Sequence, residues 1–281
     1  MYKRNGVRIL VESALMLAIG TVLSIFKLLS LPYGGSVTIA SMLPVIIIAY
    51  RNGTGAGIVT GLAFSLIQQL LGLKNLGYVT GWVSVVAVIF LDYVLAFTVT
   101  GLGGIFRNKA RSQAQALVLG ALFTSILRYF FHVISGATVW AGISIPTTAA
   151  LVYSIGYNAT YMIPETIVLT LVAYYIGISL DLRKQRPSVM KRSEQEAFPW
   201  PKLVAGLLFV AALVFATVLV FAKLQDPETG DFMITGLNDV NWALVLSVSL
   251  PLMAAAGVLF GLSDRITSKK ANVDKKDEEN K

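Results

Sequence analysis

Residues 203–222 read LVAGLLFVAALVFATVLVFA, an apolar run without a charged side chain that lies between Lys202 and Lys223. A bilayer core is spanned by roughly 20 such residues in a helix that rises about 1.5 Å per residue. A water-soluble core does not need an unbroken run of this length. The stretch therefore predicts a chain that crosses a membrane.

Seven further apolar runs surround this one. Together they predict eight spans, at residues 8–31, 36–50, 54–73, 79–101, 114–137, 147–177, 202–222 and 241–262. The second is short and contains Pro44, and the sixth is long and contains Pro164, where we expect a kink or a tilt.

The composition agrees with a membrane protein. Of 281 residues 56% are hydrophobic, with 23 Lys and Arg against 15 Asp and Glu. A net charge of +8 would favour nucleic acid as the partner of a soluble protein, but here the basic residues lie between the apolar runs. The absence of cysteine excludes a disulfide scaffold, thiol catalysis and cysteine-ligated zinc. We predict an all-α polytopic membrane protein with membrane lipid, and not nucleic acid, around it.

The basic residues also predict the orientation. With the N-terminus inside, 19 of the 23 Lys and Arg fall in cytoplasmic segments, as the positive-inside rule requires. The outside loops hold only Lys74 and Lys223, and the last of them carries Asp226, Glu228, Asp231 and Asp239. Both termini are therefore expected in the cytoplasm.

The chain divides at a charged, proline-containing stretch. Residues 1–180 hold six predicted helices, 181–200 a cytoplasmic linker, 201–262 a transmembrane hairpin, and 263–281 a charged tail expected to be disordered. No internal repeat is evident, which weakens the case for a carrier built from two inverted halves.

Few ionisable residues fall inside the predicted spans: Glu12, Lys27, Asp92, Arg128, His132 and Glu165. Placing such a side chain within the membrane costs about 2.5–3.5 kcal/mol, so each of them is expected to have a partner or a function. Glu12 and Lys27 lie near helix ends and are expected to snorkel. Asp92 falls near the midplane if its helix begins at Val79, and higher if the helix breaks at Gly77 or Gly81.

Aromatic residues gather at the level of Asp92 and His132. Tyr153, Tyr157 and Tyr161 are spaced four apart, so they share one helix face, and Asn158 borders it. Tyr78, Trp82, Tyr93 and Trp140 stand at a similar depth. A carboxylate, an imidazole, an amide and several rings predict an outward-facing pocket for a flat, cationic heteroaromatic ligand.

Other interpretations of the same residues stay open. Tyr and Trp near helix ends often form only an interfacial belt. Asp92 could neutralise Arg128, and His132 could make a bond between helices. Glu165 is expected in a structural ion pair. Ala14 and Ala18 place small residues one turn apart, which permits close helix approach, either to a partner or within the bundle.

Three stretches resemble a known family: 32–44 (PYGGSVTIASMLP), 128–136 (RYFFHVISG) and 152–165 (VYSIGYNATYMIPE). They are similar to the thiamine-specific substrate-binding (S) component of energy-coupling factor transporters, a family once described as proton-coupled thiamine transporters. The resemblance covers roughly residues 7–180.

The resemblance implies a six-helix protein of the bacterial plasma membrane. Such proteins capture thiamine in an outward-open pocket, under a lid formed by the loop after the first helix. They are not enzymes, need no cofactor or metal, and have no ATPase of their own. They dock on a transmembrane coupling protein with two cytoplasmic ATPase subunits.

Positions of this chain that match the family's motifs are expected to have the roles that those motif residues have in the family. The resemblance implies ligand binding by Asp92, Tyr93, His132, Trp140, Tyr153 and Asn158, more loosely by Tyr78, and partner docking by Ala14 and Ala18. Asp92 stands where Glu is expected, so its side chain is one methylene shorter. Tyr33 lies where some relatives have Trp, so an aromatic wall is either missing or supplied by Tyr33.

Two other classes of function would place different demands on the same residues. A self-sufficient carrier would relay protons through Asp92, His132 or Glu165. A membrane enzyme would need a nucleophile–base pair or a metal cluster, and the chain has one His, no HExxH and no P-loop. A phosphate would require basic residues in the outer half, where only Arg128 and Lys27 stand, so unphosphorylated thiamine is preferred.

Overall fold

The computed structural model describes residues 6–140, 148–190, 200–223 and 234–279. Seven helices in these ranges are long and apolar enough to cross a membrane. This confirms the all-α polytopic fold class. The chain forms two compact units, residues 1–194 and 195–281.

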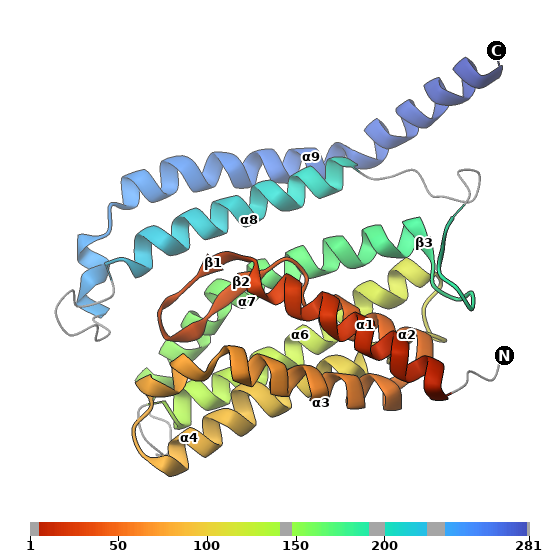
Figure 1. Cartoon of the computed structure of the whole chain (residues 1–281). Coiled ribbons are helices and arrows are strands. Elements are labelled where there is room, and N and C mark those ends of the chain that lie inside the picture. The colour runs from red at the N-terminus through yellow and green to blue at the C-terminus, as the bar shows by residue number, and fades with distance from the viewer. Residues whose placement is uncertain (1–5, 141–147, 191–199, 224–233, 280–281) are drawn as a thin grey trace. The chain divides into compact units, whose positions relative to one another are not determined.

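The first unit is a bundle of helices (Figure 1). Its members are α1 (Gly6–Ile25), α2 (Leu43–Asn52), α3 (Thr54–Leu71), the segment Trp82–Phe106, α6 (Gln113–Thr138) and α7 (Thr148–Ser179). The segment Trp82–Phe106 consists of α4 (Trp82–Val88), the π-helical η3 (Ile89–Leu95), α5 (Ala96–Thr98) and the 3-10 helix η4 (Val99–Phe106). A short 3-10 helix, η2 (Leu73–Tyr78), connects α3 to it.

The first two predicted spans were wrong in their bounds. α1 ends at Ile25, and β1 (Lys27–Ser30) and β2 (Ser36–Thr38) then pair antiparallel around η1 (Pro32–Gly34). We call residues 27–38 the lid hairpin. α2 has only 10 residues, because Pro44 lacks an N–H and is accommodated in the first turn of a helix rather than its interior.

The short helix α2 forms the centre of this unit. Its residues from Leu43 to Arg51 are all buried, and Val45, Ile46 and Ile48 are 0% exposed. A helix that is apolar all round must be surrounded by protein or lipid, and α2 contacts α1, α3, η4 and α6. The ten-residue helix is therefore enclosed by its neighbours and is hardly exposed to lipid.

The sixth predicted span is confirmed as one continuous helix, α7, with Pro164 inside it. The predicted linker does not begin as an unstructured segment. β3 (Leu180–Asp181) pairs with β4 (Ser188–Val189), and the Leu182 N–H donates to Gln113 Oε1 at 3.0 Å. The rest of the linker, residues 191–199, lies outside the described residues.

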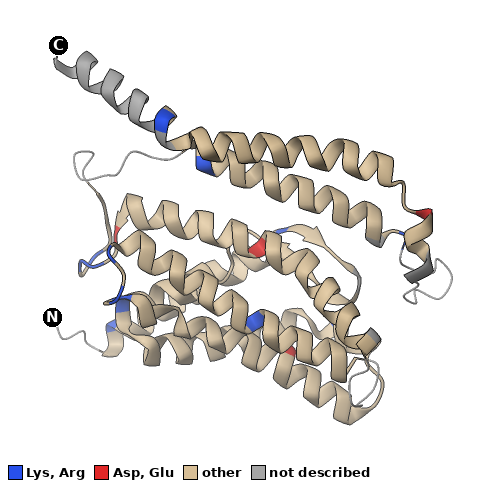
Figure 2. Cartoon of the chain, turned by 180° about the vertical axis from the view of Figure 1, so that it is seen from behind, with Lys and Arg blue, Asp and Glu red and all other residues tan. Residues whose placement is uncertain are grey.

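Most Lys and Arg of the first unit gather at the end of the bundle near the N-terminus (Figure 2). We call this the basic end; it comprises Arg8, Arg51, Arg107, Lys109, Arg111, Arg183, Lys184 and Arg186. The lid hairpin follows the other end of α1.

The second unit is a helical hairpin. α8 (Trp200–Phe221) and α9 (Trp242–Glu279) flank the 3-10 helix η6 (Ile234–Asp239), and Ser249 Oγ donates to the Ala212 carbonyl at 3.3 Å. α9 continues as a helix to Glu279, so the expectation of a disordered tail was wrong over that range. The predicted acidic loop residues Asp226, Glu228 and Asp231 lie outside the described residues.

Candidate functional site

Asp92 lies in the π-helical segment η3 and is 8% exposed. Gly81, whose φ of 85° favours glycine, precedes the first helical residue, Trp82. The helix therefore begins after Gly81 rather than at Val79. This start corresponds to the higher of the two depths in the membrane that the sequence allowed for Asp92. Single π turns within helices are frequent at functional sites because they redirect side chains.

Three side chains form hydrogen bonds with the Asp92 carboxylate. His132 Nδ1 lies 2.7 Å from Oδ1, Ser135 Oγ donates to Oδ2 at 2.6 Å, and Trp140 Nε1 donates to Oδ2 at 2.9 Å. His132 and Ser135 are three residues apart on α6 and so share a face. The carboxylate is thereby fixed in position inside the protein.

Asn158 of α7 joins this group from the neighbouring helix. Its Nδ2 donates to the His132 carbonyl at 3.3 Å and to the Ser154 carbonyl at 2.9 Å. The Tyr161 hydroxyl donates to Asn158 Oδ1 at 2.6 Å. The predicted residues Asp92, His132, Trp140 and Asn158 thus form one connected cluster.

The tyrosines of α7 form a row beside the cluster. The ring centroids of Tyr153 and Tyr157 are 5.9 Å apart and nearly parallel, and those of Tyr157 and Tyr161 are 5.8 Å apart, edge to face. The His132 ring lies 6.3 Å from that of Tyr161. These separations are those of interacting aromatic pairs, so the row continues from the lid side to the imidazole.

The lid hairpin contacts the same side chains. The Tyr33 ring lies 5.4 Å from Tyr78 and 6.4 Å from Trp140, and the Gly35 N–H donates to the Tyr157 hydroxyl at 3.2 Å. A Cβ at Gly35 would meet Tyr157 and Tyr161, so only glycine allows this approach. Tyr33 has a φ of 62°, which is uncommon for a residue with a side chain and marks a constrained position.

Two of the predicted ligand residues stand apart from the carboxylate. The Tyr93 hydroxyl donates to the Gly72 carbonyl at 3.3 Å and accepts from Asn75 at 3.1 Å, which directs the ring toward η2. Asn75 is the residue that a Cβ at Gly34 would meet. Tyr78 is 58% exposed and meets the lid through Tyr33. The geometry connects both tyrosines with the lid hairpin more than with Asp92.

The other buried charges pair with one another. Arg128 Nη1 donates to Glu165 Oε2 at 3.1 Å and also contacts Met42 Sδ. Thr38 donates to Glu165 Oε1 at 3.0 Å from the end of the lid hairpin. Glu165 thus takes part in an ion pair, as the sequence favoured, and Arg128 pairs with Glu165 rather than with Asp92.

Glu12 and Lys27, which were expected to snorkel near the two ends of the first helix, have different surroundings. Glu12 accepts from Arg51 Nη2 at 2.9 Å and from Arg8 Nε at 3.3 Å, so it is held in a polar network within the basic end. Lys27 belongs to β1 and not to a helix. Partial burial lowers the pKa of Lys27 from its ordinary value, and the charge of Lys74 lowers it further.

Ala14 and Ala18 are both exposed on α1. Most of this helix is uncovered within the protein, since only Gly20 and Ser24 are buried. A small-residue face is therefore open to lipid or to another helix.

Ser135 and Tyr161 belong to the cluster but were not predicted as site residues. Their spacing was a usable signal, because Ser135 follows His132 by three residues and Tyr161 follows Tyr157 by four. Within the described ranges no three His, Asp or Glu side chains lie close enough to hold a metal ion.

Comparison with known proteins adds a second line of information. A family model described as Thiamine transporter protein (Thia_YuaJ) matches residues 10–184, which excludes α8 and α9. The chain is 37% identical over 174 residues to the thiamine transporter ThiT of Bacillus subtilis (strain 168). That alignment covers 58% of this chain and 86% of the relative.

Proposed function

This chain belongs to the Thiamine transporter protein family, and from that premise we propose that it is the thiamine-capturing S component of an energy-coupling factor importer. The observation that carries the proposal is the cluster around Asp92, which joins a carboxylate, an imidazole and an indole directly beside a row of tyrosines.

The cluster is suited to both rings of thiamine. The ligand joins an aminopyrimidine to a cationic thiazolium, and a buried carboxylate such as Asp92 balances that charge. Trp140, Tyr153 and Tyr157 offer faces for stacking, where each cation–π contact contributes about 0.5–2 kcal/mol. His132 and Asn158 supply groups that hydrogen-bond ring nitrogens. Tyr78 and Tyr93 support the lid hairpin, which closes over the bound vitamin.

Energy for uptake comes from partners in this proposal. The sequence contains no P-loop, so ATP is hydrolysed by two cytoplasmic ATPase subunits that act through a transmembrane coupling protein. The exposed Ala14 and Ala18 on α1 form the docking face for that coupling protein. The basic end faces the cytoplasm of a bacterium, with both termini inside and the lid hairpin outside.

Calorimetric titration of the purified chain tests the ligand. Thiamine should bind tightly, and thiamine pyrophosphate and hydroxymethylpyrimidine more weakly. The pyrophosphate carries negative charge toward Asp92, and the pyrimidine lacks the cationic ring. Equal affinity for all three compounds would contradict the proposed roles of Asp92 and the stacking rings.

Uptake in cells tests the energy source. Thiamine import should continue when the proton gradient is collapsed while ATP is maintained. Loss of import under those conditions would favour a proton-coupled carrier, in which the contact between Asp92 and His132 serves proton transfer.

A further inference from the structure

A pocket opens in the basic end of the first unit, remote from Asp92. Its volume is about 350 Å³, and it is lined by Tyr50, Arg107, Asn108 and Arg183. The four residues come from three segments: the last turn of α2, the loop after η4, and the turn between β3 and β4. The site thus depends on the folded bundle and not on a single loop.

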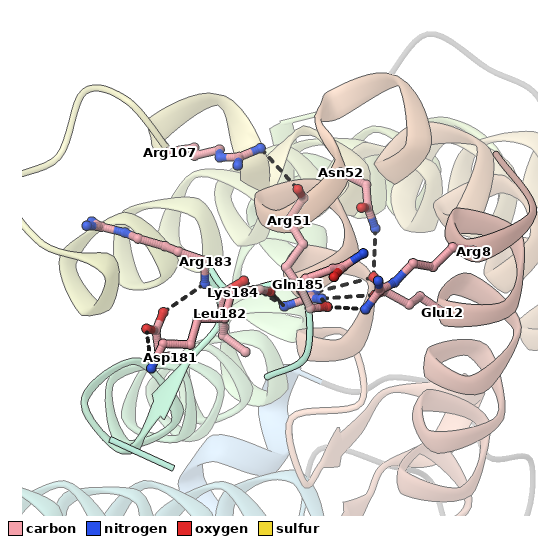
Figure 3. A network of polar contacts seen from close by, with 10 residues as sticks. All are labelled: Arg8, Glu12, Arg51, Asn52, Arg107, Asp181, Leu182, Arg183, Lys184 and Gln185. Carbon is pink, nitrogen blue, oxygen red and sulfur yellow. Dashed lines mark hydrogen bonds and ion pairs between the residues drawn. The ribbon is translucent and has the colours of Figure 1, made fainter. Parts of the chain in front are cut away.

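Two cationic side chains, Arg107 and Arg183, line this pocket on either side of Tyr50. Arg183 Nε donates to the Tyr50 hydroxyl at 3.2 Å, and the Arg107 guanidinium carbon lies 5.9 Å from the centre of the Tyr50 ring. Among the described residues neither Arg107 nor Arg183 forms an ion pair. In Figure 3 the Arg183 side chain extends away from Glu12 and Arg51.

Two acidic residues of the basic end, Glu12 and Asp181, pair with other cations. Glu12 accepts from Arg8, Arg51 and Asn52. Asp181 accepts from the Arg183 backbone N–H at 3.0 Å and lies 3.3 Å from Lys184 Nζ. The charge of Asp181 also acts on Arg183, but Asp181 forms its ion pair with Lys184, so the pocket keeps a net positive charge from Arg107 and Arg183.

One guanidinium has a structural role that accounts for its position. Arg107 Nη1 donates to the Arg51 carbonyl at 3.0 Å, at the end of α2, where basic side chains commonly satisfy helix carbonyls. Arg183 has no such role, because its Nε bond is to the Tyr50 side chain. Tyr50 itself is 1% exposed, so this phenol positions the guanidinium from within the core.

The pocket also lies at a particular depth. α2 ends at Asn52, η4 at Phe106 and α7 at Ser179, and polar residues follow each of these ends. The pocket is therefore at the boundary between the apolar spans and water, the level of lipid phosphates. Basic pockets between transmembrane helices are known binding sites for lipid headgroups.

We propose that this pocket binds a phosphate group, namely that of an anionic phospholipid headgroup. The planar guanidiniums of Arg107 and Arg183 match phosphate oxygens in geometry and charge. The Asn108 amide and the Tyr50 hydroxyl add further donors. Such a lipid would join α2, the loop after η4 and the β3–β4 turn.

Native mass spectrometry of the full chain tests the proposal. The protein is purified with equal amounts of phosphatidylglycerol and phosphatidylcholine, and the retained lipid is measured. Phosphatidylglycerol should be retained preferentially. Arg183→Gln should weaken its retention about fivefold, the contribution expected of one basic residue. Asn108→Asp, which places a carboxylate in the pocket, should weaken it at least as much.

Arg111→Gln is the matched control, since Arg111 belongs to the same basic loop but does not line the pocket. It should retain the lipid as the unchanged protein does, and thiamine binding by all three variants reports correct folding. Equal loss in Arg111→Gln and Arg183→Gln, or no preference for phosphatidylglycerol, would overturn the proposal.

Inorganic phosphate distinguishes the source of the phosphate group. If it displaces phosphatidylglycerol from the unchanged chain, the pocket accepts phosphate from solution as well as from lipid. If it does not, the lipid is the specific ligand. Both outcomes support a phosphate site provided that Arg183→Gln weakens the retention of phosphatidylglycerol and Arg111→Gln does not.

Discussion

Arg128 Nη1 lies 3.1 Å from Glu165 Oε2, and each of the two side chains is 4% exposed. This ion pair shows that Glu165, and not Asp92, neutralises Arg128. Asp92 contacts no Lys or Arg within the described ranges, and Ser135 and Trp140 donate to it as neutral groups. A carboxylate in that position is available to a cationic ligand, as the proposed capture of thiamine requires.

Asp92→Asn should weaken thiamine binding by about tenfold or more, because bonds to a charged group contribute about 1.5–3 kcal/mol. Titration calorimetry measures the change. Asp92→Glu is the matched control, since it keeps the charge and is the residue expected from the family resemblance. Unchanged affinity in Asp92→Asn would remove Asp92 from the site.

Ser135→Ala should weaken thiamine binding about fivefold, because Asp92 Oδ2 loses its closest donor. Thr138→Ala removes a hydroxyl from the same helix, one that bonds the Ile134 carbonyl and not Asp92. Its affinity should stay unchanged. If both variants behave alike in the same titration, the contact between Ser135 and Asp92 has no part in binding.

Gly35→Ala should hinder closure of the lid hairpin, since the added Cβ meets Tyr157 and Tyr161. Overpacking of this kind costs about 1–3 kcal/mol, so thiamine should bind about tenfold more weakly and dissociate faster. Gly77→Ala is the control, because a Cβ there meets nothing within 4 Å. Stopped-flow measurement of tryptophan fluorescence gives the dissociation rate, and equal rates in the two variants would count against the lid.

Apolar runs and charge positions were sufficient to predict the fold class. Length and hydropathy locate helices in lipid because every backbone group must bond internally. The same reasoning failed at residues 27–38, where an apolar sequence forms the lid hairpin. The apolar residues of α2 are buried by protein rather than by lipid, so hydropathy alone does not show where this short helix begins.

The site could be predicted only in part. The spacing of residues on α6 and α7 predicted that His132 and Asn158 face the site, because the helical period is regular. The π-helical turn at Asp92 and the orientation of Tyr93 depend on packing between distant segments, which sequence period does not encode. The ion pair of Glu12 was not predicted for the same reason, because its partner Arg51 lies on another helix.

Glu12→Ala should destabilise the bundle, because it leaves the Arg51 side chain, 2% exposed, without its acidic partner. Loss of one member of a buried pair costs about 3–5 kcal/mol, and partial exposure of Glu12 reduces this to about 2 kcal/mol. The thermal midpoint should fall by about 5 °C. Arg8→Gln removes the more exposed partner and should change the midpoint less; an equal shift would show that Arg51 does not depend on Glu12.

Ala14→Trp and Ala18→Trp should leave thiamine binding intact and abolish uptake. Both positions are exposed on α1 and remote from Asp92 in the bundle, so an indole there fills no part of the proposed site. It would, however, prevent another helix from approaching closely, which small residues permit. Ile19→Trp is the control, because Ile19 is 47% exposed but lies on a different face of the helix. Calorimetry measures binding and radiolabelled thiamine measures import in cells. Normal import in both alanine variants would reject the docking role of α1, whereas loss in Ile19→Trp as well would indicate a general intolerance of α1 to bulk.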